Sequence, residues 1–200
     1  MGQRSQIYIR FSDKDNKHYL TAKYFQWNYS ERMISRARHT IEWIQSAIKY
    51  EWLFSTQTEN LKRILDVNFD MQDVQIGIDI IKEYNEDSYW KEEGYSINDY
   101  VFNCQDNNDG KLFIDIKDNQ IKYAFIDSEC NLNYIMDGNQ YMNWEYNYQY
   151  NSKDIWITGK YLDYEQKLTC IHNIEEIEKI ATLMTKEELE DFMTCHYENV

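Results

Sequence analysis

The residues most able to do chemistry are four arginines near the start of the chain. Arg32 and Arg36 are spaced i, i+4 in a predicted helix, so they share one of its faces. Arg4 and Arg10 share a face of a predicted strand. Because guanidinium groups bind phosphates well, the four predict an anion- or nucleotide-binding patch. The alternative is that they pair with carboxylates of the same chain.

A second candidate site is a tract in which aromatic and acidic side chains alternate with amides. Its members are Tyr141, Trp144, Glu145, Tyr146, Tyr148, Tyr150 and Trp156. Tyr and Trp are enriched at interface hot spots, and carboxylates beside them suit a partner rich in Lys and Arg. If the segment EYNYQYN is extended, Tyr146, Tyr148 and Tyr150 lie on one face. The tract predicts a partner-binding surface; the alternative is that half of its rings pack the core.

The stretch 105–116 (QDNNDGKLFIDI) has the acids of a calcium loop. With Gly110 at the sixth position of an EF-hand loop, Gln105 is first and Ile116 last, where a carboxylate and a glutamate are required. A two-residue turn at Asp118-Asn119 explains the segment better. The turn pairs residues as follows: Leu112 with Phe125, Ile114 with Tyr123, Asp115 with Lys122 and Ile116 with Ile121. The sequence therefore predicts a β-hairpin here.

No pattern indicates a cofactor, a metal or a catalytic residue. The residues that resemble metal ligands are Cys170, His172, Cys195 and His196. Cys170 and His172 point to nearly opposite sides of a helix, and the paired spacings of zinc sites are absent. The sequence also lacks the glycine-rich and nucleophile motifs of common enzymes. A metal-dependent enzyme that uses scattered carboxylates remains an alternative.

Composition predicts one folded acidic domain over residues 1–200, with a helical C-terminal subregion over 161–200. The chain has 21 Lys and Arg against 35 Asp and Glu, and 18 Tyr. Residues 1–63 have a net charge of +5 and residues 64–200 of −19. This asymmetry predicts internal pairing or two faces of opposite sign. With no membrane span, no secretory signal and scattered cysteines, we expect a cytoplasmic protein with reduced thiols.

The elements predict an α+β fold, an antiparallel sheet built from hairpins with two longer helices packed on it and a short C-terminal helix. Alternation indicates strands, and spacing of three and four residues indicates helices. The expected strands are 4–11, 19–27, 73–84 and those within 100–126, and residues 85–99 form an acidic loop. The expected helices are 30–52, capped by Asn28, then 58–65, 161–183 and 185–197, the last with a Thr185–Glu188 capping box.

Four segments carry a resemblance: GQRSQIYIRF, YFQWNYSERMISRARHTIEWI, NFDMQDV and QDNNDGKLFIDI. In these the chain resembles small uncharacterised proteins carried by phages and mobile elements of low-GC bacteria. The resemblance implies a mobile-element setting, in which small acidic proteins often block host defence proteins, as anti-CRISPR proteins do. It supplies no catalytic residues.

The first hypothesis for function is a non-enzymatic inhibitor. Its acidic, aromatic surface would occupy the basic groove of a host protein that handles nucleic acid, such as a CRISPR nuclease. Carboxylates would replace phosphates and rings would replace stacked bases. Direct binding to nucleic acid or membrane is not expected, and a homo-oligomer stays open. The second hypothesis is a protein that sequesters a signalling nucleotide through the arginine patch.

Overall fold

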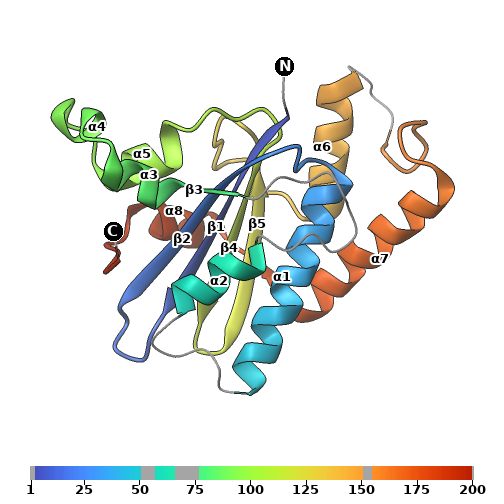
Figure 1. Cartoon of the computed structure of the whole chain (residues 1–200). Helices are drawn as coiled ribbons and strands as arrows, with labels where there is room; N and C mark the ends of the chain where they lie inside the picture. Colours follow the sequence, from blue (N-terminus) through green and yellow to red (C-terminus); the bar gives the residue numbers. More distant parts are fainter. Residues whose placement is uncertain (1–2, 51–56, 66–76, 151–154, 200) are drawn as a thin grey trace.

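The computed structural model describes residues 3–50, 57–65, 77–150 and 155–199. These residues form a six-stranded sheet with helices on both faces (Figure 1). The strands are β1 Arg4–Ser12, β2 His18–Gln26, β3 Ile78–Asp79, β4 Lys111–Lys117, β5 Gln120–Ile126 and β6 Thr182–Leu183. The helices are α1 Glu31–Lys49, α2 Gln57–Leu65, α3 Ile80–Glu86, α4 Tyr89–Glu92, α5 Ile97–Asn103, α6 Gly138–Tyr150, α7 Tyr164–Ile180 and α8 Lys186–Thr194.

The β4–β5 hairpin has the predicted register. Ile114 lies opposite Tyr123, and Asp115 opposite Lys122. The turn residues Asp118 and Asn119 have φ values of 51° and 61°, the left-handed conformation that a type I′ turn requires. Asx residues tolerate this conformation because their short side chains bond locally. The hairpin prediction for 105–126 is therefore confirmed from Lys111 onward.

The α+β class is confirmed, but the sheet is mixed rather than antiparallel throughout. The strand order is β3-β2-β1-β4-β5-β6. β1 pairs with β2 and β4 with β5 in the antiparallel sense, whereas β1 and β4 are parallel. The chain between β2 and β4 crosses over, so that the second hairpin joins the first in the same direction. Local patterns contain no information on this long-range pairing.

Two hydrophobic layers cover the sheet. The odd residues of β1, Ile7 and Ile9, pack with α1, α6 and α7 on one face. Tyr8 packs with α3, α5 and α8 on the other. Figure 1 shows α1, α6 and α7 grouped on one side and α3, α4 and α5 on the other. The predicted helices 30–52 and 161–183 are thus α1 and α7. Strand β1 is buried on both of its faces, because helices cover both sides of the sheet and Gln6 and Arg10 are buried as well.

The prediction for residues 73–103 is wrong in several places. Residues 66–76 lie outside the described residues, and the strand that follows has only two residues before α3 begins. Asp79 accepts a hydrogen bond from the Lys82 backbone N–H and so caps α3. The expected acidic loop 85–99 contains α4 and the start of α5, which Ser96 and Asp99 open with a capping box. Helix α5 then occupies 97–103, where strand had been expected.

Two helix starts test the predicted caps. Thr185 and Glu188 form the predicted capping box of α8. Helix α1 begins after Ser30 and not at Asn28. The Asn28 side chain is buried instead, where it accepts from Arg36 Nε at 3.0 Å and donates to Ser5 Oγ at 3.1 Å.

In the described part of the chain, no helix has the length and apolar character needed to cross a membrane.

Candidate functional site

The aromatic tract lies mainly on helix α6 and is not extended. Asp137 and Gln140 exchange hydrogen bonds of 2.8 and 2.9 Å at its start, as in a capping box. Because a helix repeats every 3.6 residues, residues four apart stack. Trp144 stacks on Tyr148, and Tyr146 contacts Tyr150, with ring centroids 5.7 and 5.2 Å apart. Because the segment is helical, the extended conformation that would place Tyr146, Tyr148 and Tyr150 on one face does not occur.

Three members of the tract are buried and cannot contact a partner in this conformation: Tyr141, Glu145 and Trp156. Tyr141 stacks on Phe125 with ring centroids 4.7 Å apart. Its hydroxyl donates to the Asp109 carbonyl at 2.9 Å and accepts from the Ser30 backbone N–H at 3.2 Å. It thereby joins α6 to the loop before β4 and to the start of α1. The prediction that these three residues lie on a partner-binding surface is wrong, because they belong to the core.

The other four members are divided between the surface and the packed side of α6. Trp144 and Tyr146 are half-buried. Tyr148 and Tyr150 are 56% and 50% exposed. Only two of the seven predicted partner-binding residues therefore present most of a ring to solvent, and the acid among the seven is buried.

Glu145 forms a buried pair with Asp109, the last acid of the loop 105–110. Burial and the neighbouring Asp109 charge raise the pKa of Glu145 well above its usual value. Burial raises the pKa of Asp109 to about 6, although the backbone N–H of Arg4 donates to it. Gln149 Nε2 donates to both carboxyl groups, at 2.9 and 3.0 Å. At neutral pH the pair therefore holds one proton and one negative charge.

The four arginines do not lie together. Arg10 is buried, forms a two-pronged ion pair with Asp115 at 2.8 Å and also contacts Asp191 at 2.7 Å. Arg4 pairs with Asp106. Both strand residues lie on the face of the sheet opposite α1, which carries the other two arginines.

Arg36 is buried on the α1 side, with its guanidinium 4.6 Å from the Phe25 ring centre. It donates to Asn28 and to the Leu65 carbonyl. Arg32 donates to the Trp27 carbonyl at 3.3 Å. Arg4 and Arg10 thus pair with carboxylates of the same chain, whereas the described partners of Arg32 and Arg36 are backbone carbonyl groups, an amide and aromatic rings.

An exposed aromatic and acidic surface lies elsewhere, in residues 80–103, which comprise α3, α4, α5 and their connections. We call this segment the acidic arm. It carries six carboxylates and two lysines. Residues 85–96 are exposed except for the half-buried Trp90. Tyr89 is 55% and Tyr95 43% exposed. The sequence predicts strand up to residue 84, an acidic loop over 85–99 and strand again from residue 100, and it predicts no binding role for any of them.

Packing between aromatic rings fixes the shape of the arm. Trp90 meets Tyr89 and Tyr95 edge-on, with ring centroids 5.3 and 5.5 Å apart. It also contacts Tyr100, which is buried against the body of the protein. The Tyr84 hydroxyl donates to the Tyr95 carbonyl at 2.9 Å. The inner rings therefore anchor the arm, while Tyr89 and Tyr95 face solvent.

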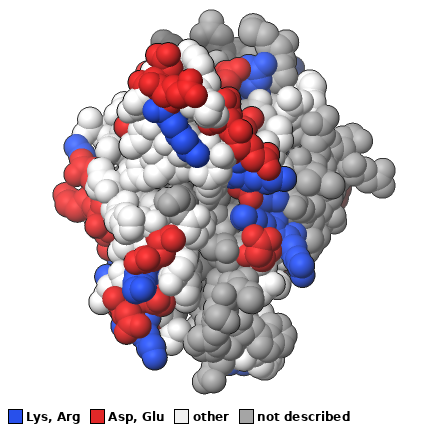
Figure 2. Space-filling model, turned by 60° about the vertical axis from the view of Figure 1, so that its left-hand side comes forward, with Lys and Arg blue, Asp and Glu red and all other residues white. Residues whose placement is uncertain are grey.

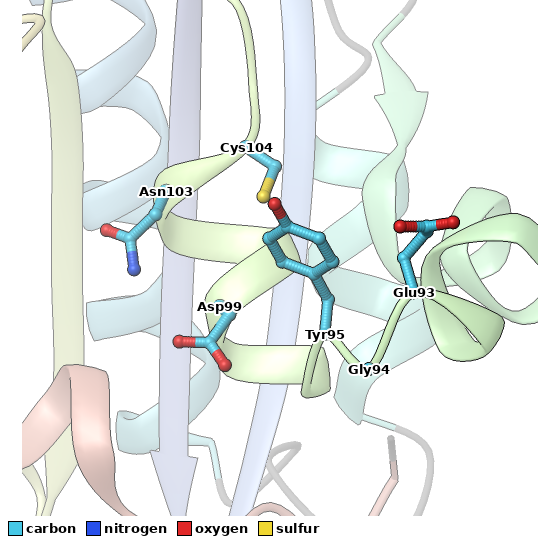
Figure 3. Close-up of a pocket in the computed structure, with 6 residues that line it drawn as sticks. All are labelled: Glu93, Gly94, Tyr95, Asp99, Asn103 and Cys104. Atoms are coloured by element: carbon cyan, nitrogen blue, oxygen red, sulfur yellow. The ribbon is translucent and has the colours of Figure 1, made fainter.

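A shallow groove of about 420 Å³ runs along the arm (Figure 3). In Figure 3 the Tyr95 ring points toward Cys104, with Asn103 and Asp99 from α5 on its left and Glu93 from the end of α4 on its right. The lining thus combines a tyrosine ring, two carboxylates and an amide. This combination suits a cationic or amphipathic side chain.

Several carboxylates of the arm are not neutralised locally. Its two lysines are engaged: Lys82 pairs with Glu86 at 3.6 Å, and Lys91 lies 5.0 Å from the Tyr84 ring centre. Among the described residues, no ion pair joins Glu92 or Glu93 to a basic side chain. Figure 2 shows red and blue side chains beside one another over the face turned forward. On this face the charges of opposite sign are interspersed. The arm, with six carboxylates and two lysines, has a local excess of negative charge.

The residues that resembled metal ligands are separated by their surroundings. Cys170 is buried on α7, whereas the His172 side chain is 55% exposed. In the described ranges, no group of three or more His, Cys, Asp or Glu residues has the geometry to hold a metal ion. The four cysteines are free thiols.

Comparisons with known proteins identify no relative. No protein-family model matches the chain. No curated protein and no solved structure matches it either.

Proposed function

We propose that the protein is a non-enzymatic binding protein that docks through its acidic arm onto a basic surface of a partner protein. The observation that supports this most is the exposure of Tyr89 and Tyr95 beside Glu92 and Glu93, which have no described ion-pair partner. Exposed rings fixed by their neighbours lose little entropy on binding, and unpaired carboxylates attract Lys and Arg.

The partner class follows from charge and from the resemblance to mobile-element proteins. A basic groove that normally holds a nucleic acid offers cations for the carboxylates and space for stacked rings. We therefore propose a cytoplasmic defence protein that handles nucleic acid, with a CRISPR nuclease as the first partner to test. The acidic arm takes the role that the sequence suggested for the tract on α6.

The nucleotide-binding alternative needs its four arginines on one surface. Arg10 and Arg36 are buried on opposite faces of the sheet, so they cannot meet around one ligand without unfolding. No described observation favours this second function.

The test is binding to an immobilised, guide-loaded CRISPR nuclease of the host, measured at two salt concentrations. We expect affinity to fall at least about tenfold between about 50 and about 300 mM salt, because exposed charges are screened. The charge reversal E92K/E93K should weaken binding at low salt by about tenfold or more. The matched control, E165K/E175K, reverses two exposed acids on α7 and should bind like the wild type.

Two results would contradict the proposal. One is binding that does not change with salt. The other is equal loss of affinity in E92K/E93K and E165K/E175K, which would show that net charge matters and the arm does not.

A further inference from the structure

A small hollow opens beside the buried carboxyl pair, on the α6 side of the molecule. It measures about 60 Å³. Its lining includes Glu145, Gln149 and four tyrosines, namely Tyr29, Tyr146, Tyr150 and Tyr161. The aromatic tract and the residues before α1 thus enclose a space that the core does not fill.

The floor of the hollow carries a carboxyl oxygen that is not satisfied by a donor. Glu145 is 1% exposed, and its Oε1 accepts from Gln149 at 3.0 Å. Its Oε2 is buried and accepts no hydrogen bond from any described residue. Glu145 also shares a side-chain hydrogen bond with Asp109, which lies behind it and does not line the hollow. Two carboxylates so close together are both charged only when a cation joins them, and otherwise they share a proton.

The walls of the hollow are faces and edges of aromatic rings. Tyr150 contacts Tyr146 and Tyr161, each with ring centroids 5.2 Å apart. Tyr161 hydrogen-bonds to Tyr29. The guanidinium of Arg32 already lies 5.4 Å from the Tyr29 ring centre, so one ring of this set binds a cation within the chain. Tyrosine rings around a carboxylate are the arrangement that favours organic cations.

Charge, size and donor count select the ligand. Carboxyl groups and phenol oxygens disfavour an anion, and the described residues hold no cluster of acidic, His or Cys side chains suited to a metal ion. A space of about 60 Å³ holds more than one water and is large enough for an ammonium group and its first methylene. A primary ammonium also has three donors for the Glu145 carboxyl group and the phenol oxygens of the walls.

We propose that this hollow binds a primary ammonium group, with Glu145 as its anionic partner, Asp109 bonded behind Glu145 and the four tyrosines as its walls. The source is either the end of a lysine side chain on another protein or a free alkylamine. Glu31 adds a further buried carboxyl oxygen nearby, with Arg32 as its neighbouring cation. The proposal does not depend on docking by the acidic arm.

The experiment is a titration followed by nuclear magnetic resonance of the Gln149 side-chain amide and the Ser30 backbone amide. The probes are n-propylamine, a short peptide with one lysine, and 1-propanol as the neutral control of similar size. We expect the amine to shift both resonances with a dissociation constant of about 1 mM, a value that four heavy atoms can supply. Propanol should leave both unchanged. A lower dissociation constant for the peptide than for propylamine identifies a protein lysine as the ligand. Equal dissociation constants identify a free amine.

Variants separate binding from folding. E145Q keeps the shape of the side chain and should weaken amine binding about tenfold or more, because it removes a charge-assisted hydrogen bond. Y150L changes a half-exposed ring and should weaken it about threefold by removing a cation–π contact. E92Q, on the acidic arm, should bind the amine like the wild type. Three results would overturn the proposal and leave water as the only occupant. They are equal shifts with propanol, no shift with amine at about 50 mM, and unchanged amine binding in folded E145Q.

Discussion

The acidic arm and helix α6 have nearly the same kinds of residues and opposite surroundings. Each combines tyrosines and a tryptophan with acidic side chains, six of them in the arm and Glu145 alone in α6. In the arm, residues 85–96 are exposed apart from Trp90. In α6, Tyr141 and Glu145 are buried and bonded to the loop before β4. Aromatic and acidic composition therefore identifies both segments, and only their packing shows which one presents a surface.

Two glycines show how α6 reaches its packed position. Gly110 has a φ of +84°, and a Cβ there would lie 2.8 Å from the Ile126 carbonyl oxygen and 3.2 Å from the rings of Tyr141 and Trp144. Only glycine combines this backbone conformation with so close an approach. At Gly94 in the arm, in contrast, a Cβ would meet nothing within 4 Å. The chain closes tightly around α6 and leaves the arm open.

The largest expected difference between the two regions is in stability. Tyr141→Ala should lower the free energy of unfolding by about 3–5 kcal/mol, because it leaves a cavity and unpairs the Ser30 and Asp109 backbone groups. Tyr89→Ala should change it by less than about 0.5 kcal/mol. Urea denaturation of the two variants beside the wild type measures both. Similar losses in the two variants would contradict the assignment of Tyr141 to the core and Tyr89 to the surface.

The next effect concerns the two kinds of carboxylate. The pKa values of Glu145 and Asp109 are raised in the native state. At a pH above the usual carboxyl pKa, the unfolded chain has therefore lost protons that the native state still holds. The free energy of unfolding of the wild type should therefore fall as pH rises from about 5 to about 8, with about 1–3 kcal/mol due to this pair.

E145Q tests this sign, because glutamine cannot titrate. Its free energy of unfolding should fall less than that of the wild type over the same pH range, whereas E92Q, with an exposed acid, should follow the wild type. Urea unfolding at both pH values gives the comparison. A parallel decline in the wild type and E145Q would show that the pair does not share a proton.

A smaller expected effect concerns the helix cap that stabilises the acidic arm and that α6 does not share. Ser96→Ala removes the capping box of α5 and should cost about 1 kcal/mol. Since the arm is anchored mainly through its inner rings, the loss should appear as faster amide hydrogen exchange in α5 and not in α6. Exchange that accelerates equally in both helices would mean that the arm and α6 unfold as one unit.

The sequence predicts those parts of the fold that depend on local rules. The β4–β5 register follows from the Asp118-Asn119 turn and the alternation on either side, both within the segment itself. Helix α1 follows from the spacing of Ile34, Ile41 and Ile44, which are all buried. The parallel pairing of β1 with β4 joins residues about a hundred positions apart, and no local pattern specifies it.

The candidate site is harder to predict because burial is decided by tertiary packing. Tyrosines at every second position of 146–150 are compatible with one face of a strand and also with two faces of a helix. The Asp137–Gln140 cap at the start of α6 favours the helix. In the arm, Ser96 and Asp99 have the spacing of a capping box, which indicates that a helix begins within the segment 85–99 interpreted as a loop. No sequence signal shows that Arg10 and Arg36 end on opposite faces of one sheet.

The most direct test compares two pairs of exposed tyrosines, one from each region, in binding to the guide-loaded CRISPR nuclease. Y89A/Y95A removes rings of the acidic arm, and Y148A/Y150A removes rings of similar exposure from α6. Neither pair should alter the urea midpoint appreciably. Docking through the arm predicts at least about thirtyfold weaker binding for Y89A/Y95A and affinity close to that of the wild type for Y148A/Y150A. The reverse order, or equal affinities for the two variants, would contradict it.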